Sequence, residues 1–190
     1  MTTASAPPLT AAPLRTLYYA RFGFAVVWAA LLVLTASSLD SLDPVRAVTV
    51  TLLVLYPLVD VAAAVVDLRS SKASRPTAAL AVNVVLSLLA AVGLAIAVGS
   101  DLAAVLRVWG AWAITAGIVQ LVVAASRRRL GGQWAQVLSG GISVLAGGSF
   151  LAQAGGSSAS LASLAGYATL GGVFFLVSAV RLHRAAQAYR

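Results

Sequence analysis

Six apolar stretches, each about as long as a lipid bilayer is thick, occupy most of this 190-residue chain. They run over residues 20–38, 45–67, 78–99, 103–125, 134–153 and 161–181. About 20 apolar residues at ~1.5 Å rise per residue span the ~30 Å hydrocarbon core of a bilayer, so each stretch is a candidate transmembrane helix. The sequence therefore predicts an all-α membrane protein with six transmembrane helices packed in one bundle.

The composition supports the same class of protein. Hydrophobic residues make up 61% of the chain and charged residues 9%. A soluble domain of this length leaves too much of its surface in water to hide so many apolar side chains. Arginine outnumbers lysine twelve to one, and alanine and valine are abundant, which indicates a GC-rich bacterial genome.

Catalytic and metal-binding patterns are missing from the sequence. The chain has no cysteine, which excludes disulfides, thiolate metal sites and cysteine nucleophiles. His183 is the only histidine, and no paired carboxylates or Ser–His–Asp arrangement accompany it. We therefore expect no enzymatic activity, no cofactor and no metal site.

The basic residues lie almost entirely on alternate predicted loops. Eleven fall on one side of the membrane, and they are Arg15, Arg21, Arg69, Lys72, Arg75, Arg127, Arg128, Arg129, Arg181, Arg184 and Arg190. Only Arg46 and Arg107 fall on the other side. Because loops rich in Lys and Arg stay in the cytoplasm, both termini are predicted to be cytoplasmic in a bacterial plasma membrane.

The basic loops suggest partners at the membrane surface. We expect contacts with anionic lipid headgroups from Arg69, Lys72, Arg75, Arg127, Arg128 and Arg129. The loops are too short to build the folded basic face that nucleic-acid binding needs, so we expect no nucleic acid partner. A second copy of the chain and another membrane protein are left open as partners.

The two ends of the chain differ from the bundle. Residues 1–15 form a leader rich in Pro, Ala and Thr that we expect to be mobile, residues 16–184 form the bundle, and 185–190 form a cytoplasmic tail. The leader is long for a signal peptide, so we expect the first stretch to be a retained helix. Cleavage near LTASS (34–38) is the alternative.

An internal repeat organises the bundle. GAWAITAGIVQLVVAASRRR (110–129) aligns with AGYATLGGVFFLVSAVRLHR (165–184) at an offset of 55 residues, and each segment ends in a basic cluster. The second stretch fits the same pattern more loosely. Each repeat is a helical hairpin, over about 20–67, 78–125 and 134–181, so successive copies enter the membrane from the same side. The sequence predicts three parallel-repeat hairpins.

These segments, together with GQWAQVLSGGISVLAGG (132–148), resemble the HdeD-like membrane proteins, domain of unknown function family 308, which a short hydrophobic repeat defines. YYARFGFAVVWAALLVL (18–34) and LVLYPLVDVAAAVVDLR (53–69) resemble the first hairpin of the same group. The resemblance implies a multi-pass membrane protein without a catalytic motif. It also implies a role in envelope or acid stress, because the family's name-giving member is associated with acid resistance in enteric bacteria.

Polar residues inside the apolar stretches are the best clue to function. Asp60, Asn83, Gln120 and Ser139 all fall about 8–10 Å below the predicted cytoplasmic boundary, and therefore share one layer. This layer is either a proton or ion site or a hydrogen-bonded clasp between helices. We favour the clasp, because no second carboxylate and no lysine shares the layer. Asp67 lies nearer the boundary, where we expect it to be solvated.

Small and aromatic residues complete the predictions. Gly117, Ser143, Gly147 and Gly172 lie on stripes of small residues, which let helices approach closely, within one chain or between two copies. The tryptophans and several tyrosines lie mostly near the predicted helix ends, which is typical of side chains in the headgroup zone.

Three functions are compatible with these patterns. The first is a non-enzymatic membrane protein acting through bundle packing and through lipid or partner contacts. The second is a small transporter or channel for protons, ions or solutes that uses the Asp60 layer. The third is an accessory subunit of a membrane complex.

Overall fold

The computed structural model describes residues 11–39, 44–70, 77–130, 133–156 and 159–187, and all regular structure in them is helical. The six long helices are α1 (Ala11–Thr35), α2 (Val45–Ser70), α3 (Thr77–Ala97), α4 (Leu102–Ser126), α5 (Trp134–Ala154) and α6 (Leu161–Gln187). Short 3₁₀ turns follow α1 (Ala36–Ser38) and α4 (Arg128–Leu130). All six helices are long and apolar enough to cross a membrane. The predicted all-α, six-span fold is confirmed.

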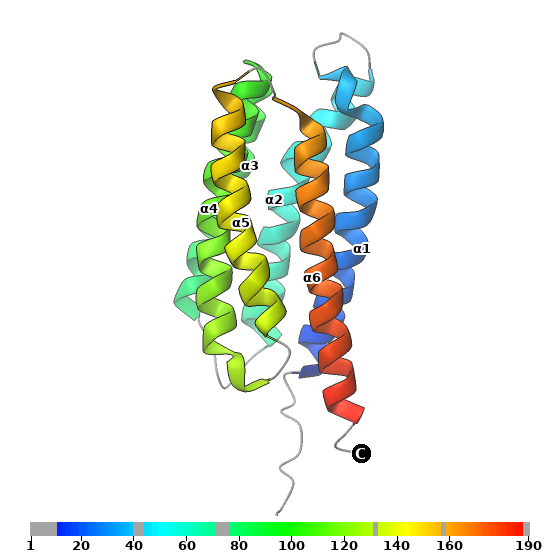
Figure 1. Ribbon diagram of the computed structural model, residues 1–190, viewed down its shortest axis with the longest axis vertical. Coiled ribbons are helices and arrows are strands. Elements are labelled where there is room, and N and C mark those ends of the chain that lie inside the picture. The colour runs from blue at the N-terminus through cyan, green and yellow to red at the C-terminus, as the bar shows by residue number, and fades with distance from the viewer. Residues whose placement is uncertain (1–10, 40–43, 71–76, 131–132, 157–158, 188–190) are drawn as a thin grey trace, which may run out of the picture.

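The helices form a closed ring (Figure 1). Each helix contacts the next one along the chain, and α6 contacts α1. The most extensive contacts join α4 to α5, α1 to α6 and α2 to α3, so they lie between the predicted hairpins rather than within them. The most extensive contacts of the ring therefore join helices of different predicted hairpins.

Glycines allow α4 and α5 to lie very close together. A Cβ atom placed on Gly117 would lie 2.7 Å from the carbonyl oxygen of Gly140 and 2.9 Å from the Cβ of Ser143. Gly172 brings α6 against α1, where a Cβ atom would lie 3.1 Å from that of Ala25. The small residues that the sequence singled out thus lie at contacts within one chain.

Large aromatic side chains fill the bundle on the side away from the chain ends. Trp28, Tyr56, Trp109 and Trp112 pack together with ring centroids 4.6–5.9 Å apart. The three tryptophans are buried, with exposed fractions of 6% or less. The prediction of a headgroup location is wrong for these three residues, because they lie on the inward faces of α1 and α4. Trp134 at the start of α5 is exposed.

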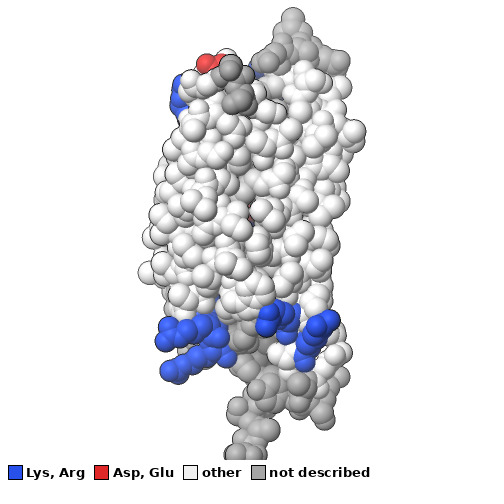
Figure 2. All heavy atoms as spheres, in the orientation of Figure 1, with Lys and Arg blue, Asp and Glu red and all other residues white. Residues whose placement is uncertain are grey.

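On the face shown in Figure 2, exposed charge gathers at the two ends of the bundle, and the surface between them carries none. At the end where α1 begins and α6 finishes, the exposed cations are Arg69, Arg128, Arg129, Arg181 and Arg184. We call this group the basic rim. Lys72 and Arg75, which were also predicted to contact lipid headgroups, lie outside the described residues.

Helix α1 begins earlier than the sequence predicts. Its first residue is Ala11, so the end of the segment expected to be mobile (1–15) belongs to the helix. Arg21 consequently lies about ten residues, or about 15 Å, inside α1. Asp60 lies about the same distance from the neighbouring end of α2 at Ser70. The two side chains therefore reach the same depth in the bundle.

Candidate functional site: a polar chamber between the helices

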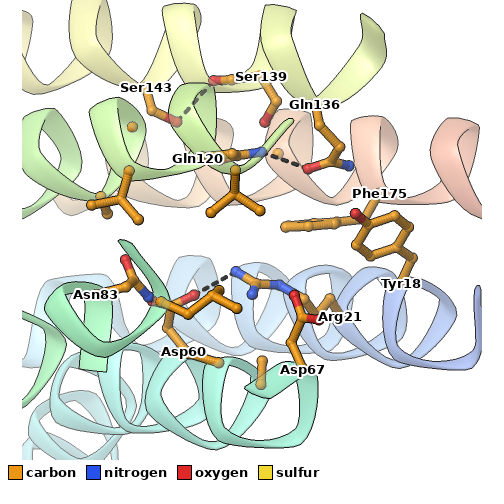
Figure 3. A pocket seen from close by; sticks show the side chains of 18 of the residues that line it. Tyr18, Arg21, Asp60, Asp67, Asn83, Gln120, Gln136, Ser139, Ser143 and Phe175 are labelled. Carbon is orange, nitrogen blue, oxygen red and sulfur yellow. Dashed lines mark hydrogen bonds and ion pairs between the residues drawn. The ribbon is translucent and has the colours of Figure 1, made fainter. Parts of the chain in front are cut away.

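A cavity of about 100 Å³ lies inside the ring, and we call it the chamber. Residues from all six helices line it, among them Asp60, Asn83, Gln120 and Ser139. A buried water needs about 10–15 Å³ of such space, so the chamber has room for several waters. In Figure 3, α4 and α5 form one bank of the chamber, and α1, α2 and α3 form the opposite bank.

Asp60 is the centre of the bank formed by α1, α2 and α3. Its Oδ1 accepts a hydrogen bond of 2.5 Å from Nη2 of Arg21. Its Oδ2 accepts bonds of 2.6 Å from Nδ2 of Asn83 and 2.9 Å from Oγ of Ser87. Three donors from α1 and α3 thus hold one carboxylate of α2, and we call these four residues the clasp.

The arginine of the clasp corrects the sequence analysis. Arg21 was counted among the cytoplasmic cations, and the layer was expected to hold a single charged group. Instead Arg21 forms an ion pair with Asp60, whose side chain is 8% exposed. The early start of α1 is the reason, because it moves Arg21 from the membrane boundary into the bundle.

A second ion pair joins α2 to the end of α4. Arg127 donates from Nη1 to Oδ2 of Asp67 at 2.6 Å and from Nη2 to Oδ1 at 2.8 Å. The two side chains are only 2% and 9% exposed. Two predictions are therefore wrong. Asp67 was expected to be solvated and Arg127 to contact lipid headgroups, but the two side chains are buried against each other. Arg128 and Arg129 are exposed, as such contacts require.

The pairing with Asp67 determines the ionisation of Arg127. Burial alone lowers the pKa of an arginine, because it disfavours the charged form. The hydrogen bonds and the negative charge of Asp67 outweigh burial here and raise the pKa of Arg127 above its usual value. The guanidinium group therefore stays charged, and the buried pair is held by opposite charges.

Glutamine side chains connect the helices on the α4 and α5 side of the chamber. Nε2 of Gln120 donates to Oε1 of Gln136 at 2.6 Å, and Nε2 of Gln136 donates to Oγ of Ser178 at 2.9 Å. This network ties α4, α5 and α6 together. The sequence placed Gln120 in one hydrogen-bonded layer with Asp60, but its partner is Gln136, across the chamber from Asp60 (Figure 3).

Serines line the same bank on α5. Ser143 accepts a hydrogen bond from the Tyr167 hydroxyl group at 3.0 Å and donates to the backbone oxygen of Ser139 at 2.9 Å. The hydroxyl group of Ser139 itself makes no hydrogen bond within the described part of the chain, although Ser139 is 4% exposed and lines the chamber.

The aromatic side chains bound one end of the chamber. Trp112 and Tyr56 line it, and the indole N–H of Trp112 donates to Oγ of Ser87 at 3.0 Å. Since Ser87 also donates to Asp60, the aromatic packing and the clasp form one connected network. The Asp67–Arg127 pair lies toward the other end, near the basic rim.

Among the described residues, no three His, Cys, Asp or Glu side chains lie close enough together to hold a metal ion. What the chamber offers instead is hydrogen-bonding amides, hydroxyls and two ion pairs.

Comparisons with protein-family models, curated proteins and solved structures find no match to this chain. Its function is therefore inferred from the chamber and from the surfaces around it.

Proposed function

We propose that this chain is a non-enzymatic, multi-pass protein of a bacterial plasma membrane, with both termini in the cytoplasm, built around a structural polar clasp. The observation that carries the proposal is the occupation of the Asp60 carboxylate by Arg21, Asn83 and Ser87. A carboxylate that takes up and releases protons must change partners during the cycle. Here both carboxylate oxygens are already used to join three helices.

The energetics favour a structural role for this pair. A charged side chain inside a membrane is costly unless an opposite charge and hydrogen bonds compensate it, and Arg21 and Asp60 compensate each other. Removing one partner of a buried ion pair typically costs about 3–5 kcal/mol, because the other charge is left uncompensated. The clasp thus commits α1, α2 and α3 to one arrangement.

Outside the bundle, the protein acts through contacts with lipid and with partners. The exposed arginines of the basic rim, such as Arg128 and Arg129, suit anionic headgroups, each worth about 1 kcal/mol near such a surface. Membership of the HdeD-like group and a role in envelope or acid stress are part of this proposal, supported by the repeat segments alone.

A double variant tests the clasp. Asp60→Asn alone leaves Arg21 unpaired, and we expect a loss of about 3–5 kcal/mol of stability in detergent. Adding Arg21→Gln to Asp60→Asn replaces the ion pair by two amides that can hydrogen-bond, so much of the loss should be recovered. If Asp60→Asn melts like the wild type and the double variant is no better, Asp60 is not a structural clasp.

Transport of a small solute is the second candidate, and the chamber is the observation that favours it. A dry, packed interior would exclude this function, but a cavity of about 100 Å³ with polar side chains in its lining lies beside the ion pairs. Flux assays in proteoliposomes distinguish the two candidates. A solute or proton flux that disappears in a well-folded Asp60→Asn variant would favour transport.

A further inference from the structure

The two ion pairs that line the chamber are built differently. Arg127 uses both terminal nitrogens on Asp67, and its side chain is 2% exposed. Arg21 gives Asp60 a single hydrogen bond from Nη2, and its side chain is 26% exposed. Within the described part of the chain, the other donor groups of Arg21 make no hydrogen bond. Both terminal nitrogens of Arg127 are thus engaged within the fold, whereas Arg21 keeps N–H donors that can bind a ligand.

The remaining donors of Arg21 are held in a fixed position. The guanidinium carbon lies 4.2 Å from the centre of the Phe175 ring, so an aromatic face covers one side of the group. Oδ1 of Asp60 accepts a hydrogen bond from one guanidinium nitrogen of Arg21. Oδ2 accepts from Asn83 and Ser87, so it is not available to a second nitrogen of Arg21. In Figure 3 the guanidinium group points into the space between the two banks.

The opposite bank offers groups that can meet a ligand bound to Arg21. Ser139 lines the chamber with a hydroxyl group that has no hydrogen-bond partner among the described residues, although only 4% of the residue is exposed. Gln120 lines the chamber beside it and uses one N–H on Gln136. This hydroxyl group is therefore free to donate to a molecule or water in the chamber.

Charge and size limit what the ligand can be. The two aspartates of the chamber are balanced by two arginines, whereas the rim is basic, so the potential at that end attracts small anions. The chamber holds the equivalent of several waters, which suits a solute of a few heavy atoms. The planar donor fork of arginine matches the two oxygens of a carboxylate.

We propose that the chamber binds a small carboxylate that enters from the basic rim, with Arg21 as its principal binding residue. The free edge of the guanidinium group donates to the two carboxylate oxygens, and Ser139 and Gln120 donate from the opposite bank. This site goes beyond the clasp, because Arg21 serves a second partner, and it would supply the substrate class for the transport candidate.

Acetate is the probe for this site, and acetamide is its uncharged counterpart. We expect sodium acetate, at roughly millimolar concentration for so small a ligand, to raise the melting temperature of the purified protein in detergent. Acetamide, or sodium chloride at equal ionic strength, should have little effect. An equal rise with chloride or acetamide, or none with acetate, would overturn the proposal.

Matched variants separate the site from the fold. Arg21→Gln combined with Asp60→Asn keeps a neutral clasp without a guanidinium group, and acetate should no longer stabilise it. The same exchange at the other pair, Arg127→Gln with Asp67→Asn, should leave the acetate effect in place. Persistence of the effect in the first variant contradicts the proposal, whatever its basal stability.

Single variants keep the test decisive if a double variant does not fold. Arg21→Lys retains a charge for Asp60 but has no planar fork, so acetate should lose its advantage over chloride. Ser139→Ala should weaken acetate binding by roughly tenfold, as expected for the loss of one hydrogen bond to a charged group. Because these readouts measure ligand binding, they can fail while the stability test of the clasp succeeds.

Discussion

Gly110 of α4 and Gly147 of α5 lie in direct backbone contact. A Cβ atom on Gly110 would lie 2.7 Å from the carbonyl oxygen of Gly147, and one on Gly147 would lie 2.6 Å from that of Gly110. Neither distance leaves room for a side chain. The pair, together with Gly117 and Gly140 farther along, makes α4–α5 the most extensive helix contact of the ring.

Neighbouring glycines of α5 give a matched test of this contact. Gly147→Leu should destabilise the protein by about 3 kcal/mol or more, because the new side chain must separate the backbones of α4 and α5. Gly148→Leu should have a much smaller effect, since nothing lies within 4 Å of a Cβ atom there. Thermal unfolding in detergent measures both. Equal losses would show that the contact does not limit stability.

The run of three arginines after α4 provides a second matched pair. Arg127→Ala leaves Asp67 charged, buried and without its bidentate partner, so we expect a loss of about 3–5 kcal/mol. Arg128→Ala removes an exposed side chain and should change stability by no more than about 0.5 kcal/mol. Chemical denaturation of the two variants side by side measures the difference, and similar midpoints would argue against the buried pair.

The tryptophans make a third comparison. Trp28 donates its indole N–H to the backbone oxygen of Leu52 at 2.7 Å, whereas that of Trp109 has no hydrogen-bond partner among the described residues. Both rings are buried, so exchange for phenylalanine removes similar volume. Trp28→Phe should therefore cost about 1 kcal/mol more than Trp109→Phe. A larger loss at Trp109 would mean that packing alone determines both values.

Topology can be tested by labelling, because the chain has no cysteine. We expect Gly156→Cys, at the end of the bundle away from the basic rim, to react with a membrane-impermeant thiol reagent in intact cells. Arg128→Cys, in the rim, should react only after the cells are opened. This labelling pattern is expected because Lys and Arg are distributed unevenly between the two ends, and loops rich in them stay in the cytoplasm. The reverse labelling pattern would place the termini outside.

The sequence predicted the spans well because hydropathy is a local property of the chain. It could not place Arg21, because that depended on where α1 begins. The helix starts at Ala11, upstream of the apolar stretch that begins at residue 20. Helical spacing held a usable signal. Tyr18, Arg21, Ala25 and Trp28 share one face of α1, and three of these four are buried.

The partners within the chamber were harder to predict for a different reason. Asp67 and Arg127 are sixty residues apart, and nothing local distinguishes Arg127 from its two arginine neighbours. Only the continuation of the buried face of α4 beyond Ala124 singles it out. Asp60, Asn83, Gln120 and Ser139 do line one chamber, but which side chain bonds to which depends on how the helices are rotated, and hydropathy does not report rotation.

The closed ring also affects how the chain assembles during synthesis. Arg21 and Asp60 belong to the first two helices, thirty-nine residues apart, so their charges can meet as soon as one hairpin has entered the membrane. Asp67 can pair with Arg127 only after α4 has been made. The face of α1 that packs on α6 is covered only when the last helix has been made. A chain that ends before Leu161 lacks α6. The face of α1 that contains Ala25, the residue that contacts Gly172, would then be exposed to lipid or to a membrane chaperone.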